Sequence, residues 1–203
     1  MIGVQGAAVF DFFVTQQEIT ASMANQRDDI SLRGCANEHR SRIFAGGVRA
    51  LSRHEKTAER AMDQCSEEQL FHCFHEEANS IAIIVKHMSG NMVSRWTDFL
   101  SSDGEKPNRN RDDEFINDFH TRKEVMDCWE KGWSTFFQTL SELQETDLLR
   151  TVTIRGEPHS VIEAIERQMY HYSYHIGQIV YVAKQLNANN WKTLTIPRSR
   201  KTT

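Results

Sequence analysis

Two histidines, His171 and His175, lie four residues apart in the segment MYHYSYHIGQIVYVAKQL. Four residues are just over one helical turn, so both imidazoles project from the same face of a helix. Two such rings can bind one divalent cation, and imidazole suits zinc, nickel, copper and iron. Two histidines that only pack have the same spacing, so a metal site needs a further ligand from another element.

His87, in the segment IVKHMSGN, is the candidate third ligand. Like His171 and His175, it comes one residue before a member of the apolar stripe of its predicted helix, so the three rings can converge. Three protein ligands plus water are typical of a catalytic metal site, whereas structural zinc sites are closed by four protein ligands. The pattern therefore predicts an open metal site between two helices.

Polar residues at helical spacing from these histidines are predicted to orient the ligands or the substrate; they are Asn91, Arg95 and Gln178. Arg95 has an alternative as an exposed cation paired with Asp98. Arg155 and Glu157, in the connection before the last predicted helix, either edge a pocket or form a loop ion pair.

A second group of metal-binding residue types comprises His72, Cys73, His75 and Glu76, in LFHCFHEEAN. These residue types can bind zinc. Their spacing is tight, the segment is a predicted connection, and no second ligand pair is evident. We expect adventitious metal binding or none.

Composition limits the function classes. The formal net charge of −4 and the pI near 6.1 argue against a nucleic-acid-binding protein that relies on phosphate contacts. The four cysteines show no C-x-x-C spacing and are predicted to be free thiols in a reducing compartment. No apolar run approaches the roughly 20 residues of a membrane span, and the first residues make a poor signal peptide. We expect a soluble cytoplasmic protein with no membrane partner.

Four long segments carry helical periodicity, at about residues 37–63, 79–100, 122–143 and 160–186. Ser160 followed by Glu163 is typical of a capping box at the start of the last helix. The segment TVTIRGEPHS alternates apolar and polar residues before a glycine and predicts a short extended segment or hairpin. The expected fold class is all-α, a four-helix bundle with an irregular N-terminal extension.

Residues 1–35 show no helical or strand periodicity and form the predicted extension, with the bundle and a short C-terminal tail in residues 36–203. Three interpretations stay open for the extension. It is a short helix, a disordered arm, or the product of an over-extended gene model whose true start is Met23.

The segments that carry the histidines, together with the closing NWKTLTIPR, resemble a branch of the DinB-like (YfiT-like) metalloprotein superfamily. The resemblance covers about residues 40–197 and includes the order of the histidine-bearing segments. It implies a four-helix bundle, a homodimer, and a divalent metal, zinc or nickel, held by His87, His171 and His175.

The resemblance also implies an activity, because characterised members of the superfamily include S-transferases and isomerases that use low-molecular-weight thiols. The first hypothesis is a metal-dependent enzyme in which the metal deprotonates a thiol that attacks a small electrophile, or activates water for hydrolysis. No thiol-binding motif is recognisable in the sequence. The alternative is a non-catalytic, metal-binding or structural helical bundle.

Overall fold

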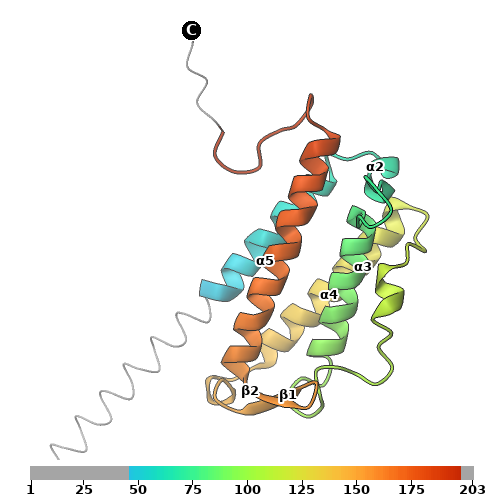
Figure 1. Cartoon of the computed structure of the whole chain (residues 1–203). Helices are drawn as coiled ribbons and strands as arrows, with labels where there is room; N and C mark the ends of the chain where they lie inside the picture. Colours follow the sequence, from blue (N-terminus) through green and yellow to red (C-terminus); the bar gives the residue numbers. More distant parts are fainter. Residues whose placement is uncertain (1–45, 198–203) are drawn as a thin grey trace, which may run out of the picture. The chain divides into compact units, whose positions relative to one another are not determined.

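Long helices lie side by side in the computed structural model, which describes residues 46–197 (Figure 1). The helices comprise residues 46–62, α2 (Glu67–Phe71), α3 (Ile81–Trp96), α4 (Arg122–Glu142) and α5 (Val161–Leu186). The 3₁₀ turns are η1 (Asp112–Phe115) and η2 (Glu145–Asp147), and the strands are β1 (Thr151–Ile154) and β2 (Glu157–Ser160). The all-α fold is thereby confirmed. The predicted extension, residues 1–35, lies outside the described residues.

Serine and threonine caps define where the long helices begin. Ser80 accepts a hydrogen bond from the Ile83 N–H at the start of α3. The predicted capping box at Ser160 is confirmed. The Ser160 hydroxyl accepts a hydrogen bond from the Glu163 N–H, and the Glu163 carboxylate accepts one from the Ser160 N–H. Such caps satisfy N–H groups that have no partner within the helix.

The predicted end of α3 near residue 100 is wrong, because the helix stops at Trp96. Thr97 is extended (φ −69°, ψ 130°), and Asp98 adopts a left-handed conformation with φ of 49°. The chain then leaves the helix as the long connection to α4. The prediction also missed α2, whose five residues are too few to show a helical period.

Aromatic side chains fill the core between α3, α4 and α5. The largest buried members are Trp96, Trp129, Trp133, Phe136 and Tyr172. The Trp96 indole N–H donates to the Tyr172 hydroxyl over 2.9 Å. This buried hydrogen bond fixes α3 against α5, the two helices that carry the three histidines.

A hairpin follows α4, as predicted, with β1 antiparallel to β2 and Ile154 opposite Glu157. Its two-residue turn has positive φ at both Arg155 (56°) and Gly156 (78°), which is typical of a type I′ turn. The Asp103 carboxylate accepts the N–H groups of Arg155 and Gly156 over 2.9 and 2.8 Å. The connection after α3 therefore holds the tip of the hairpin in place.

No helix within residues 46–197 combines the length and the apolar character needed to cross a membrane. The predicted cytoplasmic location stays a prediction.

Gly132 tests how closely α3 and α4 approach. A Cβ at this position would meet the Ser89 Cα at 2.8 Å and the Met92 Sδ at 3.0 Å. We expect Gly132→Ala to lower the free energy of unfolding by about 1–3 kcal/mol, because overpacking outweighs the helix propensity that alanine adds. Urea denaturation measures the change.

Gly177→Ala is the matched control, since a Cβ there meets no atom within 4 Å in the middle of α5. It should raise stability by up to about 1 kcal/mol. Equal effects of both substitutions would show that the α3–α4 contact is looser than described.

Candidate metal centre

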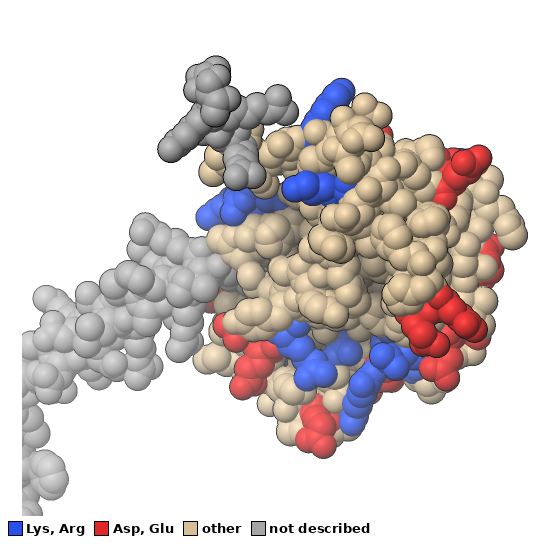
Figure 2. All heavy atoms as spheres, turned by 45° about the horizontal axis from the view of Figure 1, so that its top comes forward, with Lys and Arg blue, Asp and Glu red and all other residues tan. Residues whose placement is uncertain are grey.

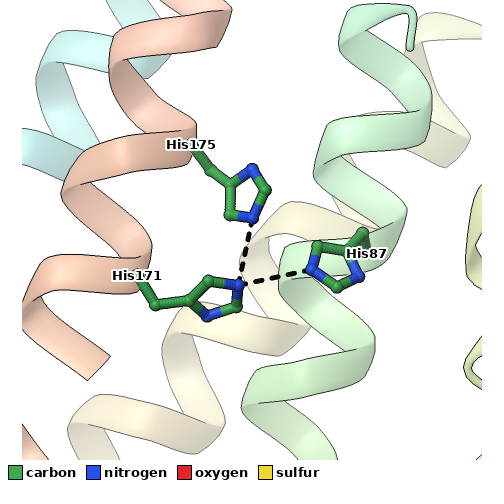
Figure 3. A group of neighbouring side chains, drawn as sticks. All are labelled: His87, His171 and His175. Atoms are coloured by element: carbon green, nitrogen blue, oxygen red, sulfur yellow. Dashed lines mark hydrogen bonds between the residues drawn. The ribbon is translucent and has the colours of Figure 1, made fainter. Parts of the chain in front are cut away.

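The three predicted histidines meet between α3 and α5, and Figure 3 shows their rings pointing toward one another. The His171 Nε2 lies 3.3 Å from the His87 Nε2 and 3.0 Å from the His175 Nε2. One ligand nitrogen from each ring lies within 4.8 Å of the other two. Nitrogens about 2.0–2.1 Å from a tetrahedral metal are about 3.3 Å apart. The rings therefore have the spacing of a three-histidine ligand set.

Hydrogen bonds to the far side of two rings fix which nitrogen faces the centre. The His87 Nδ1 lies 2.9 Å from the Glu114 Oε2, which as a carboxylate can only accept, so Nδ1 carries the proton. The His175 Nδ1 likewise lies 2.8 Å from the Gln178 Oε1. Both rings then present an Nε2 lone pair to the centre.

The donor set fits a cation better than a proton. The Nε2 of His171 can give a single proton to only one of the two facing lone pairs, which leaves the other without a partner. A divalent cation placed among the three nitrogens would accept all three lone pairs. Metal ligation by these three histidines stays a prediction. Their ring nitrogens have the spacing that it requires.

Burial and neighbouring charges keep two of the rings, His171 and His175, in the neutral form that a metal needs. Burial lowers the pKa of His171 to about 3, with further lowering by His175, His87 and two arginines. Burial also lowers the pKa of His175. Neither ring needs to lose a proton near neutral pH before it can bind a cation.

Glu114 is the residue of the site that sequence reasoning missed. Burial opposes its ionisation, but hydrogen bonds from His87 and Arg109 outweigh that effect and lower the pKa of Glu114. Arg109 donates to both carboxylate oxygens, with Nε over 2.7 Å and Nη2 over 2.8 Å. A Cβ at residue 90 would overlap the Glu114 carboxyl, so Gly90 leaves the space that this side chain needs.

No periodic signal could have identified Glu114, which lies 27 residues after His87. It comes from η1, within a polar connection that contains several other acidic residues. Arg109, from the same connection, was missed for the same reason.

The residues predicted to orient ligands or substrate lie close to the histidines. Gln178 contacts His175, and Asn91 accepts the Tyr172 hydroxyl over 3.4 Å. Arg95 is 3% exposed, so its interpretation as an exposed partner of Asp98 is wrong. Its nearest carboxylate oxygen belongs to Glu105, 3.9 Å away.

Of the other residues that the sequence singled out, some lie at the site and some do not. Arg155 pairs with Glu105 over 3.1 Å and lines a pocket beside the histidines, so both of its interpretations hold. Glu157 pairs with Ile154 in the hairpin and does not line that pocket. Residues 72–76 are exposed, and within residues 46–197 the three histidines form the one group with metal-ligand spacing.

Glu114→Gln should lower metal affinity by about 10–100-fold, because an amide no longer supplies the negative charge that polarises His87. Competition with a chromogenic chelator measures the change for zinc and nickel. Glu124→Gln is the control, because that carboxylate caps α4 at an exposed position. Unchanged affinity in Glu114→Gln would exclude a role for this carboxylate in metal binding.

The metal-free protein should lose stability as the pH falls below 6.5, the ordinary histidine value, toward 3. Over this range the unfolded state binds a proton at His171 that the folded state does not. Each such proton lowers the free energy of unfolding by about 1.4 kcal/mol per pH unit. Urea denaturation between pH 6.5 and 4.5 should give a shallower slope for His171→Gln than for the wild type. Identical slopes would show that this ring is not buried as a neutral group.

Comparisons with known proteins identify the family and the fold of this chain. The model of the family described as "Protein of unknown function (DUF1572)" matches residues 43–200. No curated protein matches the sequence. The fold is similar to the crystal structure of a DinB-like protein from Bacillus cereus ATCC 10987, at 16% identity and a TM-score of 0.53. That match covers 77% of this chain and 97% of the other. The chain therefore belongs to the DUF1572 family and has the predicted DinB-like fold.

Proposed function

We propose that this protein is a divalent-metal-dependent enzyme that transfers a low-molecular-weight thiol to a small electrophile. His87, His171 and His175 hold the metal, zinc or nickel. The convergence of their three Nε2 atoms beside a pocket is the observation that carries the proposal.

The site is open on one side, which supports catalysis over a structural role. The metal-ligand group has three members within the described residues, and no cysteine or carboxylate completes it. Two of the three, His87 and His171, also line a pocket of about 310 Å³. Structural zinc sites are closed by four protein ligands, whereas a catalytic site keeps a position for water or substrate.

The residues around the pocket favour a nucleophile that is ionised by the metal. Among residues 46–197, no aspartate, glutamate, lysine or tyrosine lines the pocket, and its arginines are too basic to accept a proton. A divalent cation bound there lowers the pKa of a coordinated thiol or water. A thiol starts from a pKa of about 8.5 and water from about 15.7, so a thiol needs far less assistance.

The described cysteines do not supply that thiol. Burial raises the pKa of Cys65 and of Cys128, which makes both poor thiolates, and neither lines the pocket. Cys73 is exposed in the connection after α2. Within residues 46–197 no cysteine is suited to supply the nucleophile, which favours a thiol from a separate molecule that enters the pocket.

A thiol-transfer assay tests the proposal. Untagged protein should contain about one metal ion per chain, and several small thiols should be consumed by a chromogenic electrophile faster than with free zinc or nickel. Chelation and His175→Ala should each abolish turnover and remove the metal. His120→Ala is the control, because that exposed ring lies outside the ligand group.

Metal at stoichiometric amounts without turnover for any thiol would reject the transferase. It would favour the alternative, in which the three histidines cross-link α3 and α5 in a non-catalytic metal-binding bundle. Release of product from an ester or amide without thiol would instead indicate hydrolysis.

A further inference from the structure

Guanidinium groups dominate the wall of the pocket beside the histidines. Five arginines line it, from α3, from the connection after α3, from the hairpin turn and from α5: Arg95, Arg109, Arg111, Arg155 and Arg167. In the space-filling view, positive side chains gather in the lower part of the drawn face, with acidic side chains around them (Figure 2). No carboxylate of the described residues lines the pocket, although the chain as a whole is acidic.

Carboxylates that contact these arginines from outside the pocket neutralise only part of their positive charge. The Glu114 carboxylate already accepts hydrogen bonds from His87 and Arg109. Glu105 is shared, with Arg109 at 3.2 Å, Arg155 at 3.1 Å and Arg95 at 3.9 Å. The two remaining arginines, Arg111 and Arg167, form no ion pair with a carboxylate of residues 46–197. Three of the five arginines therefore share these two carboxylates, and Asp103 is also close enough to interact with Arg95. The positive charge that stays uncompensated points to an anionic ligand.

Arg95 is the clearest member of this excess. Its side chain is 3% exposed, and its Nε and Nη1 are buried without a hydrogen-bond partner. Burial is also the main reason why the pKa of Arg95 is lowered. Gly104 leaves room for it, since a Cβ there would come within 2.7 Å of the Arg95 Cδ. Buried donors of a charged group are normally satisfied, so these two favour an acceptor that reaches Arg95 from the pocket it lines.

Arg155 provides an independent observation at the pocket mouth. It occupies a left-handed position of the type I′ turn, where asparagine, aspartate or glycine is preferred. A long cation in this strained conformation is uncommon and is held there by the Asp103 carboxylate. The turn thus positions a guanidinium beside the pocket at the expense of local backbone strain.

We propose that this pocket binds an oxyanion of the substrate, a phosphate or dicarboxylate group, between Arg95 and Arg155. The inference rests on the proposed function, because it treats the pocket as the substrate pocket of that enzyme. The planar guanidinium fork matches both oxyanions through paired N–H donors. Gln168, 2% exposed with an unpartnered amide oxygen, can turn its NH₂ group toward the same anion.

Isothermal titration of the full-length, metal-free protein with inorganic phosphate and with malonate tests the pocket at constant ionic strength. Removing the metal ensures that an anion is not bound as a metal ligand, and acetate serves as the singly charged comparison. Wild type should bind a dianion more tightly than acetate. Phosphate alone indicates a phosphorylated substrate, and malonate alone indicates a carboxylic acid.

Arg95→Met should weaken binding by about tenfold or more, because two charge-assisted donors are lost. Its melting temperature without ligand should stay the same or rise, since an incompletely compensated buried charge is removed. A large fall in melting temperature would assign Arg95 a structural role instead.

Arg155→Gln should weaken binding several-fold, with Arg150→Gln as its matched control. The two side chains are 53% and 52% exposed and each pairs with one carboxylate, but residue 150 does not line the pocket. Equal weakening by both substitutions, or no binding of either dianion to the wild type, overturns the inference.

The outcome is separable from that of the thiol assay. Dianion binding that depends on Arg95 and Arg155, in a protein without turnover, leaves the anion site standing and removes the transferase. Turnover of neutral electrophiles, unaffected by either dianion or by these two substitutions, leaves the transferase standing and removes the anion site.

Discussion

The buried carboxylate of Glu114 is the contact on which the rest of the site depends. One oxygen accepts the Nδ1–H of His87, and both oxygens accept from Arg109. A buried carboxylate with no partner would be costly, and here an imidazole and a guanidinium satisfy it together. Its position fixes the tautomer of His87 and thereby turns the Nε2 lone pair toward the other two histidines. Gly90 is part of this arrangement, because any side chain there would displace the carboxylate.

The same contact joins two parts of the site that come from different kinds of structure. Rigid helices supply the three imidazoles, whereas the irregular connection between α3 and α4 supplies Glu105, Arg109 and Glu114. Arg109 binds both of these carboxylates, and Glu105 continues the network to Arg155 in the hairpin turn. An ionic chain therefore runs from a helix that carries a histidine, through a connection, to the hairpin. A displacement of the hairpin turn would therefore move the arginines that line the pocket before it affected the positions of the histidine rings.

Sequence reasoning succeeded where a residue's position follows from local periodicity. Helical spacing placed His171 and His175 on one face, and the capping pattern located Ser160 at the start of α5. It failed for Glu114, because a contact spanning 27 residues between a helix and an irregular connection leaves no period. Arg95 had two interpretations because burial depends on the segment folded over it, which helical spacing cannot show. The early end of α3 was also not predictable from helical spacing. The apolar pattern continues beyond Trp96, but Thr97 is extended and Asp98 is left-handed, which ends the helix.

Charge at the site has two opposing consequences. Arg95 and Arg109 contribute to the low pKa of His171, and so help to keep the imidazole in its ligating form. The same guanidiniums repel a divalent cation at the imidazoles, since like charges interact strongly where water is scarce. Glu114 offsets part of this repulsion from behind His87, and Glu105 offsets part of it from behind the arginines. The remaining excess of positive charge lies on the pocket side of the imidazoles, where an anion bound in the pocket would reduce the repulsion on a cation held by the three histidines.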